Sequence, residues 1–137
     1  CQGLILRGIF MLRQKEISWF YQEGASYIFP DAWEEYVKPI PIDERDDMLN
    51  AYYKRLTSPD AQIRLEAARA WSIWEASTSR LFPDLDLKQR FGVDTFAEAF
   101  ARIECHYFIN QGFLEPEDQL LLNVNKIRHI PAVIVQG

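Results

Sequence analysis

Two short apolar runs, one near each end of the chain, constrain the fold most. Residues 4–9 and 132–136 are rich in Ile, Leu and Val, and each is long enough for one short buried strand. Residues 12–127 between them show helical periodicity broken by turn residues, without internal repeats. Two isolated strands around a helical block are unusual for a complete domain. We therefore expect these two runs to be neighbouring parallel strands of a larger sheet. The sequence therefore predicts a mainly α single domain over residues 1–137 with two terminal strands.

The longest helical pattern, residues 61–79, follows Asp60 in a clear capping position and carries two tryptophans. Trp71 and Trp74 lie three residues apart and continue one apolar stripe. Glu75 lies directly beside this stripe. Residue statistics favour a carboxylate that reaches water. The alternative is that Glu75 lines an aromatic-walled pocket for a positive group, because a buried carboxylate is costly without a cation or donor.

A second helical segment repeats this arrangement around Glu104. Glu104 lies four residues after Phe100 and four before Phe108, so its neighbours along the helix are aromatic. We predict that Glu75 and Glu104 converge on one ammonium group, in a pocket lined by Phe108 and Trp71, and that at least one has a raised pKa. The expected core stripe of this helix is Phe96, Phe100, Ile103 and Tyr107.

Turn residues predict several helix boundaries in the second half of the chain. Asp94 or Thr95 is expected to cap the helix that carries Glu104. Gly112 is expected to follow this helix in the left-handed conformation. Pro116 is expected to begin a last helix that ends near Ile127.

Composition excludes several classes of function. Hydrophobic residues make up 48% of the chain and the net charge is −5, which is typical of a folded domain without a basic surface for nucleic acid. The apolar runs are shorter than a membrane span, so we expect no membrane partner. No signal-like leader is evident, and two cysteines, Cys1 and Cys105, are too few for a disulfide framework. These features predict a cytoplasmic protein with free thiols.

Motifs for chemistry are mostly absent from the sequence. There is no Gly-x-Ser-x-Gly nucleophile motif and no glycine-rich phosphate loop. Cys105 and His106 are adjacent on a helix and point about 100° apart, a poor geometry for a nucleophile and its base. His129 has no metal-ligating neighbour, so we expect no zinc site and no cofactor. Asp43 is expected to cap a helix over residues 44–56, and we assign the acids of residues 43–47 to the first turn of that helix.

Six longer strings carry a specific resemblance. They are residues 6–10, 19–26, 29–33, 68–75, 101–108 and 127–137. Through these strings the chain resembles the proline iminopeptidase (prolyl aminopeptidase) family, serine peptidases of the α/β-hydrolase fold, over essentially its whole length. The resemblance implies that residues 12–127 form the helical cap (lid) of such an enzyme, and that the terminal strands flank it.

The resemblance also implies roles for individual residues. Glu75 and Glu104 would bind the free amine of an amino-terminal proline, and Phe10, Phe20 and Phe108 would surround its ring. Phe20 lies where many relatives carry tyrosine, so a hydroxyl of the pocket is expected to be missing. The assignment is physically sensible, because an ammonium needs carboxylates and a pyrrolidine ring needs apolar walls.

The catalytic residues of the family are expected outside this chain. The resemblance implies a nucleophilic serine upstream of Cys1, an aspartate in a string whose first glycine is Gly137, and a histidine further on. We therefore expect residues 1–137 alone to be inactive as a peptidase, as in a truncated relic of the enzyme. Two alternatives remain open: a binding module for amino-terminal, proline-like amines, and a structural or interaction protein with a collapsed pocket. In each case we expect a homodimer that forms through the terminal strands.

Overall fold

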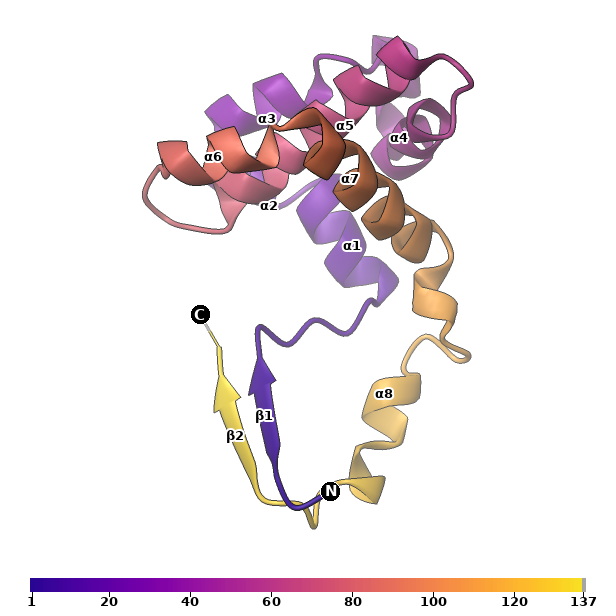
Figure 1. Cartoon of the computed structure of the whole chain (residues 1–137). Coiled ribbons are helices and arrows are strands. Elements are labelled where there is room, and N and C mark those ends of the chain that lie inside the picture. Colours follow the sequence, from indigo (N-terminus) through magenta and orange to yellow (C-terminus); the bar gives the residue numbers. More distant parts are fainter. Residues whose placement is uncertain (137) are drawn as a thin grey trace.

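The computed structural model describes residues 1–136, and Gly137 lies outside the described residues. Helices α1 to α7 form one block, while α8 and both strands form an arm below it (Figure 1). The fold is mainly α with two short terminal strands, as the sequence predicts. The helices are α1 (Gln14–Tyr21), α2 (Ala25–Ile28), α3 (Pro30–Val37), α4 (Met48–Leu56), α5 (Ala61–Thr78), α6 (Leu85–Phe91), α7 (Asp94–Ile109) and α8 (Gln119–Leu122).

The two strands are neighbours in one parallel pair. Strand β1 (Leu4–Arg7) runs beside β2 (Ala132–Val135), with Leu4 opposite Ala132 and Arg7 opposite Val135. The predicted parallel pairing is therefore confirmed. β1 ends at Arg7, before the predicted residue 9, because Gly8 has a φ of +56° and turns the chain out of the extended conformation.

The core of the helical block is built from aromatic rings around α5. Trp71, Trp74, Tyr36 and Tyr52 are fully buried. Tyr36 stacks on Tyr52 at 4.7 Å and on Trp74 at 5.3 Å between ring centroids. As predicted, Asp60 caps α5, and its side chain accepts a hydrogen bond from the Gln62 backbone at 2.8 Å. Because stacked rings allow few side-chain rotamers, this core fixes α3, α4 and α5 relative to one another.

The predicted core stripe of α7 is wrong for three of its four residues. Phe96, Ile103 and Tyr107 are 43%, 61% and 48% exposed. Ile103 and Tyr107 instead line an open groove of about 700 Å³ between α4 and α7. The buried face of α7 consists of Ala97, Ala101, Cys105 and Phe108.

Small residues explain why this other face of α7 is buried. α7 packs closely against α5, and the Ser72 hydroxyl reaches the Ala97 carbonyl at 3.3 Å. Alanines permit such an approach, whereas phenylalanines at the contact would force the helices apart. The rings of Phe96 and Phe100 stack on each other at 5.5 Å.

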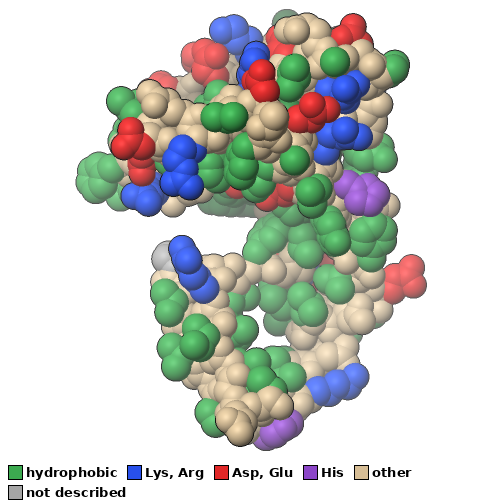
Figure 2. Space-filling view, viewed as in Figure 1, with side chains coloured by type: hydrophobic (Ala, Val, Ile, Leu, Met, Phe, Trp, Pro, Cys, Tyr) green, Lys and Arg blue, Asp and Glu red, His purple; other side chains and the backbone are tan. Residues whose placement is uncertain are grey.

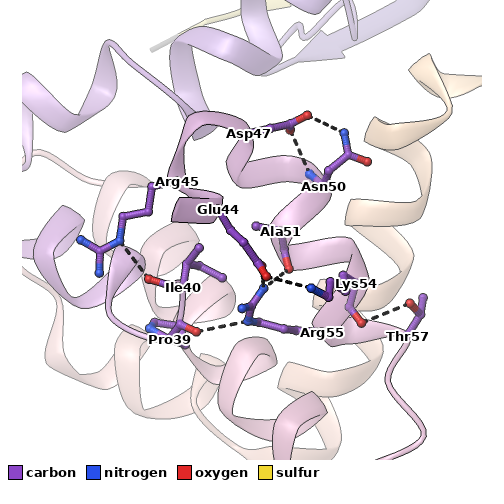
Figure 3. Close-up of polar contacts among 10 residues, drawn as sticks. All are labelled: Pro39, Ile40, Glu44, Arg45, Asp47, Asn50, Ala51, Lys54, Arg55 and Thr57. Carbon is purple, nitrogen blue, oxygen red and sulfur yellow. Dashed lines mark hydrogen bonds and ion pairs between the residues drawn. The ribbon is translucent and has the colours of Figure 1, made fainter. Parts of the chain in front are cut away.

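The acidic segment before α4 also differs from its prediction. Residues 42–47 form a 3₁₀ helix, η1 (Ile42–Asp47), and Asp47 rather than Asp43 caps α4. Figure 3 shows Glu44 between two cations, with 2.8 Å to Lys54 Nζ and 2.6 Å to Arg55 Nη1. Arg55 also donates to the backbone carbonyls of Pro39 and Ala51, at 3.2 and 2.8 Å. These bonds hold η1 and the preceding connector against α4.

Two further boundary predictions are wrong in part. Neither Asp94 nor Thr95 caps α7, since Val93 occupies that position and Asp94 pairs with Arg69 at 2.6 Å. The predicted helix over residues 116–127 shrinks to α8 and a 3₁₀ turn, η3 (Val124–Lys126). α8 ends where the Asn123 side chain donates to the Gln119 carbonyl at 2.7 Å.

Candidate functional site

Two carboxylates lie on one stacked aromatic pair inside the helical block. Glu75 is in the last turn of α5, Glu104 is on the neighbouring helix α7, and both are partly exposed. The Tyr21 hydroxyl donates a hydrogen bond to Glu75, and the Trp71 indole N–H donates to Glu104 at 2.8 Å. The rings of Tyr21 and Trp71 stack at 4.5 Å with their planes 13° apart. The structure therefore brings the two predicted acids to the same place.

The surroundings of the acids disfavour two negative charges. Burial, together with the charge of Glu104, raises the pKa of the Glu75 carboxyl to about 8, although the Tyr21 hydrogen bond opposes this. Burial raises the pKa of Glu104 to about 7, opposed by the Trp71 hydrogen bond. The predicted upward pKa shift is therefore found for both acids. Within residues 1–136, neither carboxylate forms an ion pair.

The three phenylalanines of the predicted ring pocket join the same aromatic cluster. Phe108 on α7 and Phe20 on α1 lie 5.0 and 4.8 Å from the Tyr21 ring. Phe10, in the connector after β1, meets Phe108 edge to face at 5.8 Å. Phe10 is 41% exposed, so the cluster reaches the surface. The structure thus places all three in the aromatic cluster whose members Tyr21 and Trp71 contact the acids, while their part in binding a ring stays a prediction.

Tyr21 is the site residue that sequence reasoning missed. It supplies a hydroxyl beside Phe20, where we expected none. Two hydrogen bonds of Gln22, immediately after α1, hold this end of the helix: its amide donates to Arg45 O and accepts from Met48 N, both at 2.9 Å. The aromatic run at residues 19–21 was a signal for the site, but it did not show which ring faces Glu75.

A hollow opens between the helical block and the strands β1 and β2, whereas the surface is continuous on the side of α8 (Figure 1, Figure 2). Hydrophobic side chains gather on both sides of this hollow in the view shown. Several strand residues are among the exposed hydrophobic ones, including Ile5 and Val133. The arm therefore presents an apolar surface that the helical block leaves uncovered.

The described residues supply no other obvious centre of chemistry. Among residues 1–136, no group of three or more His, Cys, Asp or Glu side chains is placed to hold a metal ion. Over the same residues, none of the helices combines the length and the apolar character needed to cross a bilayer. The pair of Glu75 and Glu104 is therefore the strongest candidate for a functional site among the described residues.

Comparison with known proteins bears on this site. No family model matches the chain. A probable proline iminopeptidase of Leptolyngbya boryana is 69% identical over 137 residues, which is the whole of this chain and 43% of that relative. The chain matches proline iminopeptidases over its full length. Proline iminopeptidases of Xylella fastidiosa (strain Temecula1) and Arabidopsis thaliana are 57% and 55% identical over 98% of the chain.

The match covers less than half the length of each of these proline iminopeptidases. The chain spans 43% of the Leptolyngbya and Xylella proteins and 36% of the Arabidopsis protein. The resemblance inferred from the sequence strings is confirmed. A helical block with two parallel terminal strands is also consistent with the cap of an α/β-hydrolase and the sheet strands beside it.

Proposed function

We propose that Glu75 and Glu104 bind the positively charged amino terminus of a proline-like residue. The observation that carries this proposal is a pair of partly buried carboxylates without an ion-pair partner in residues 1–136, held on one stacked aromatic pair. An ammonium between them would offset the cost of burial that raises both pKa values, and the charge of Glu104 that further raises the pKa of Glu75. Hydrogen bonds between charged groups are also the stronger ones, which favours such a ligand.

The shape of the ligand follows from the number of donors and from the walls. A prolyl amino terminus is a secondary ammonium with two N–H bonds, one for each carboxylate. Its pyrrolidine ring is apolar and would pack against Phe10, Phe20 and Phe108. Phe20 and Phe108 contact the Tyr21 ring, and Phe10 contacts Phe108. This division between a charged end and apolar walls supports a proline-like residue over a lysine side chain.

The relatives' name suggests the larger activity to which this site would contribute. We infer that the chain is the amine-binding segment of a prolyl aminopeptidase, and that residues 1–137 alone do not hydrolyse peptides. Their sequence contains no Gly-x-Ser-x-Gly motif to supply a nucleophile. Incubation with a proline arylamide tests this directly. Turnover that persists through purification, and disappears in Glu104→Gln, would contradict the proposal.

Binding is tested separately from hydrolysis. We expect L-prolinamide to shift the NMR signals of the site, whereas N-acetylprolinamide, which has no ammonium, does not. Glu75→Gln combined with Glu104→Gln should abolish the response to prolinamide. A response to prolinamide without hydrolysis would also fit a binding module for amino-terminal amines. Absence of any response would instead favour a structural or interaction protein with a collapsed pocket.

A further inference from the structure

Trp71 is linked to both acids, directly to Glu104 and through the Tyr21 ring to Glu75. Its indole N–H donates to Glu104 at 2.8 Å. Its face stacks at 4.5 Å on Tyr21, whose hydroxyl donates to Glu75. A displacement of this one indole would therefore change the position of both carboxylates.

The surroundings of Trp71 leave it little freedom to move. The side chain is fully buried. Tyr52 meets the indole edge to face at 5.3 Å, and Phe108 and Tyr36 lie 6.2 Å away by ring centroids. Rings in contact on several sides keep a buried side chain in one rotamer. The indole is thus a rigid element between the two glutamates.

From this geometry we propose that Trp71 is a positioning residue, which fixes the spacing and orientation of Glu75 and Glu104 for their ammonium ligand. The inference rests on the proposed amine-binding function for its purpose, but its structural part stands without a ligand. A carboxylate that loses its only strong donor can rotate and is less well stabilised in the ionised form. Specific binding of a small cation requires both acids in one fixed arrangement.

Trp74 provides a matched control on the same helix. It lies three residues after Trp71, and it is equally buried. Unlike Trp71, its indole nitrogen has no hydrogen-bond partner among the described residues 1–136. Trp71→Phe and Trp74→Phe therefore remove the same volume from the core, but only the first removes a donor to a carboxylate.

The first experiment needs no ligand. The side-chain carboxyls of glutamate are followed by ¹³C NMR against pH in the unmodified chain and in both variants. We expect the titration midpoint of Glu104 to rise in Trp71→Phe and to stay unchanged in Trp74→Phe, although both variants unfold at lower temperature. Equal midpoints in the two variants would overturn the positioning role.

The second experiment adds L-prolinamide. We expect Trp71→Phe to bind it about tenfold more weakly than Trp74→Phe, as for the loss of one charge-assisted hydrogen bond. Equal affinities would overturn the inference. If the unmodified chain does not bind prolinamide while the Glu104 midpoint still rises in Trp71→Phe, the proposed function fails and the positioning of the carboxylates stands.

A third variant covers the case in which Trp71→Phe does not fold. β-(3-Benzothienyl)alanine at position 71 replaces the indole N–H by sulfur and keeps the size of the ring. The stacking on Tyr21 is then retained and the donor to Glu104 is lost. We expect the same rise in the Glu104 midpoint, and an unchanged midpoint in this folded variant would contradict the proposal.

Discussion

At the scale of single residues, the acid pair is held by neutral groups. Tyr21 on α1 and Tyr36 on α3 lie near enough to feel the charge of both glutamates, and Cys105 on α7 feels that of Glu104. Burial raises the pKa of each of these three groups, so they stay uncharged at neutral pH and add no positive charge. Without a ligand, protonation is therefore the way in which the described residues relieve the repulsion between Glu75 and Glu104.

This environment predicts how stability depends on pH. In the unfolded chain both carboxyls titrate near pH 4.5, and in the folded chain at about 8 and about 7. The folded state binds more protons between these limits, so the free energy of unfolding should fall as pH rises from about 5 to about 8. One pH unit of displaced titration corresponds to about 1.4 kcal/mol, so we expect a loss of several kcal/mol over this range. Urea unfolding at several pH values measures it.

The control for this pH dependence is the double variant Glu75→Gln with Glu104→Gln. It removes both titrating groups and keeps the size of the side chains. Its stability should vary less between pH 5 and 8 than that of the unmodified chain. If the two proteins show the same pH dependence, the acids do not titrate as described and the site is more open to water than its geometry indicates.

The sequence predicted which residues lie at this site better than the hydrogen bonds between them. Glu75, Glu104 and Phe108 were identified from their aromatic neighbours and from the resemblance. The hydrogen-bond donor to Glu75 was not identified, because the hydrogen bond from Tyr21 depends on how α1 crosses α5. Periodicity places a residue on a face of its own helix, and it does not give the crossing angle between helices.

At the scale of elements, α7 shows where periodicity alone is ambiguous. Two apolar stripes run along this helix at acceptable spacing, one with large residues at its centre and one with Ala97 and Ala101. Hydrophobicity favoured the stripe of large residues. The structure buries the alanine stripe because α5 already fills the interior with Trp71 and Trp74, which leaves little room for more large side chains.

Opposite substitutions on these two stripes test the packing of α7. Ala101→Leu adds volume at a fully buried contact and should lower the free energy of unfolding by about 1–3 kcal/mol. Ile103→Ala removes volume from a side chain that is 61% exposed and should change it by only about 0.5 kcal/mol. Urea denaturation of both variants measures the difference. A larger loss in Ile103→Ala would mean that the predicted stripe faces the core after all.

At the scale of the whole molecule, two connectors join the helical block to the arm, and they touch. Gly112 has a φ of +61°, as the sequence predicted, and an added Cβ there would lie 2.7 Å from the Leu12 side chain. Leu12 itself has a φ of +59°, which its sequence gave no reason to expect. This contact follows from both connectors leaving the block at the same point, a property of the tertiary fold.

The arm below these connectors has more apolar surface than a two-stranded sheet can cover. Ile5 and Val133 are opposite each other in the parallel register, and they are 83% and 61% exposed. Ile134 and Val135 are also exposed. Two strands alone are marginally stable in water, and their free edges carry unpaired backbone groups.

We propose that the 137-residue chain, produced on its own, forms a homodimer in which the arms of two copies cover each other. Burial of the apolar strand faces should contribute several kcal/mol at about 25 cal/mol per Å². Light scattering at high micromolar concentration should give twice the chain mass of 16.1 kDa. Ile5→Lys with Val133→Lys places charge at the centre of that face and should give a monomer with the helical block still folded. A monodisperse monomer of the unmodified chain would contradict the dimer, and a dimer that survives both lysines would place the interface elsewhere.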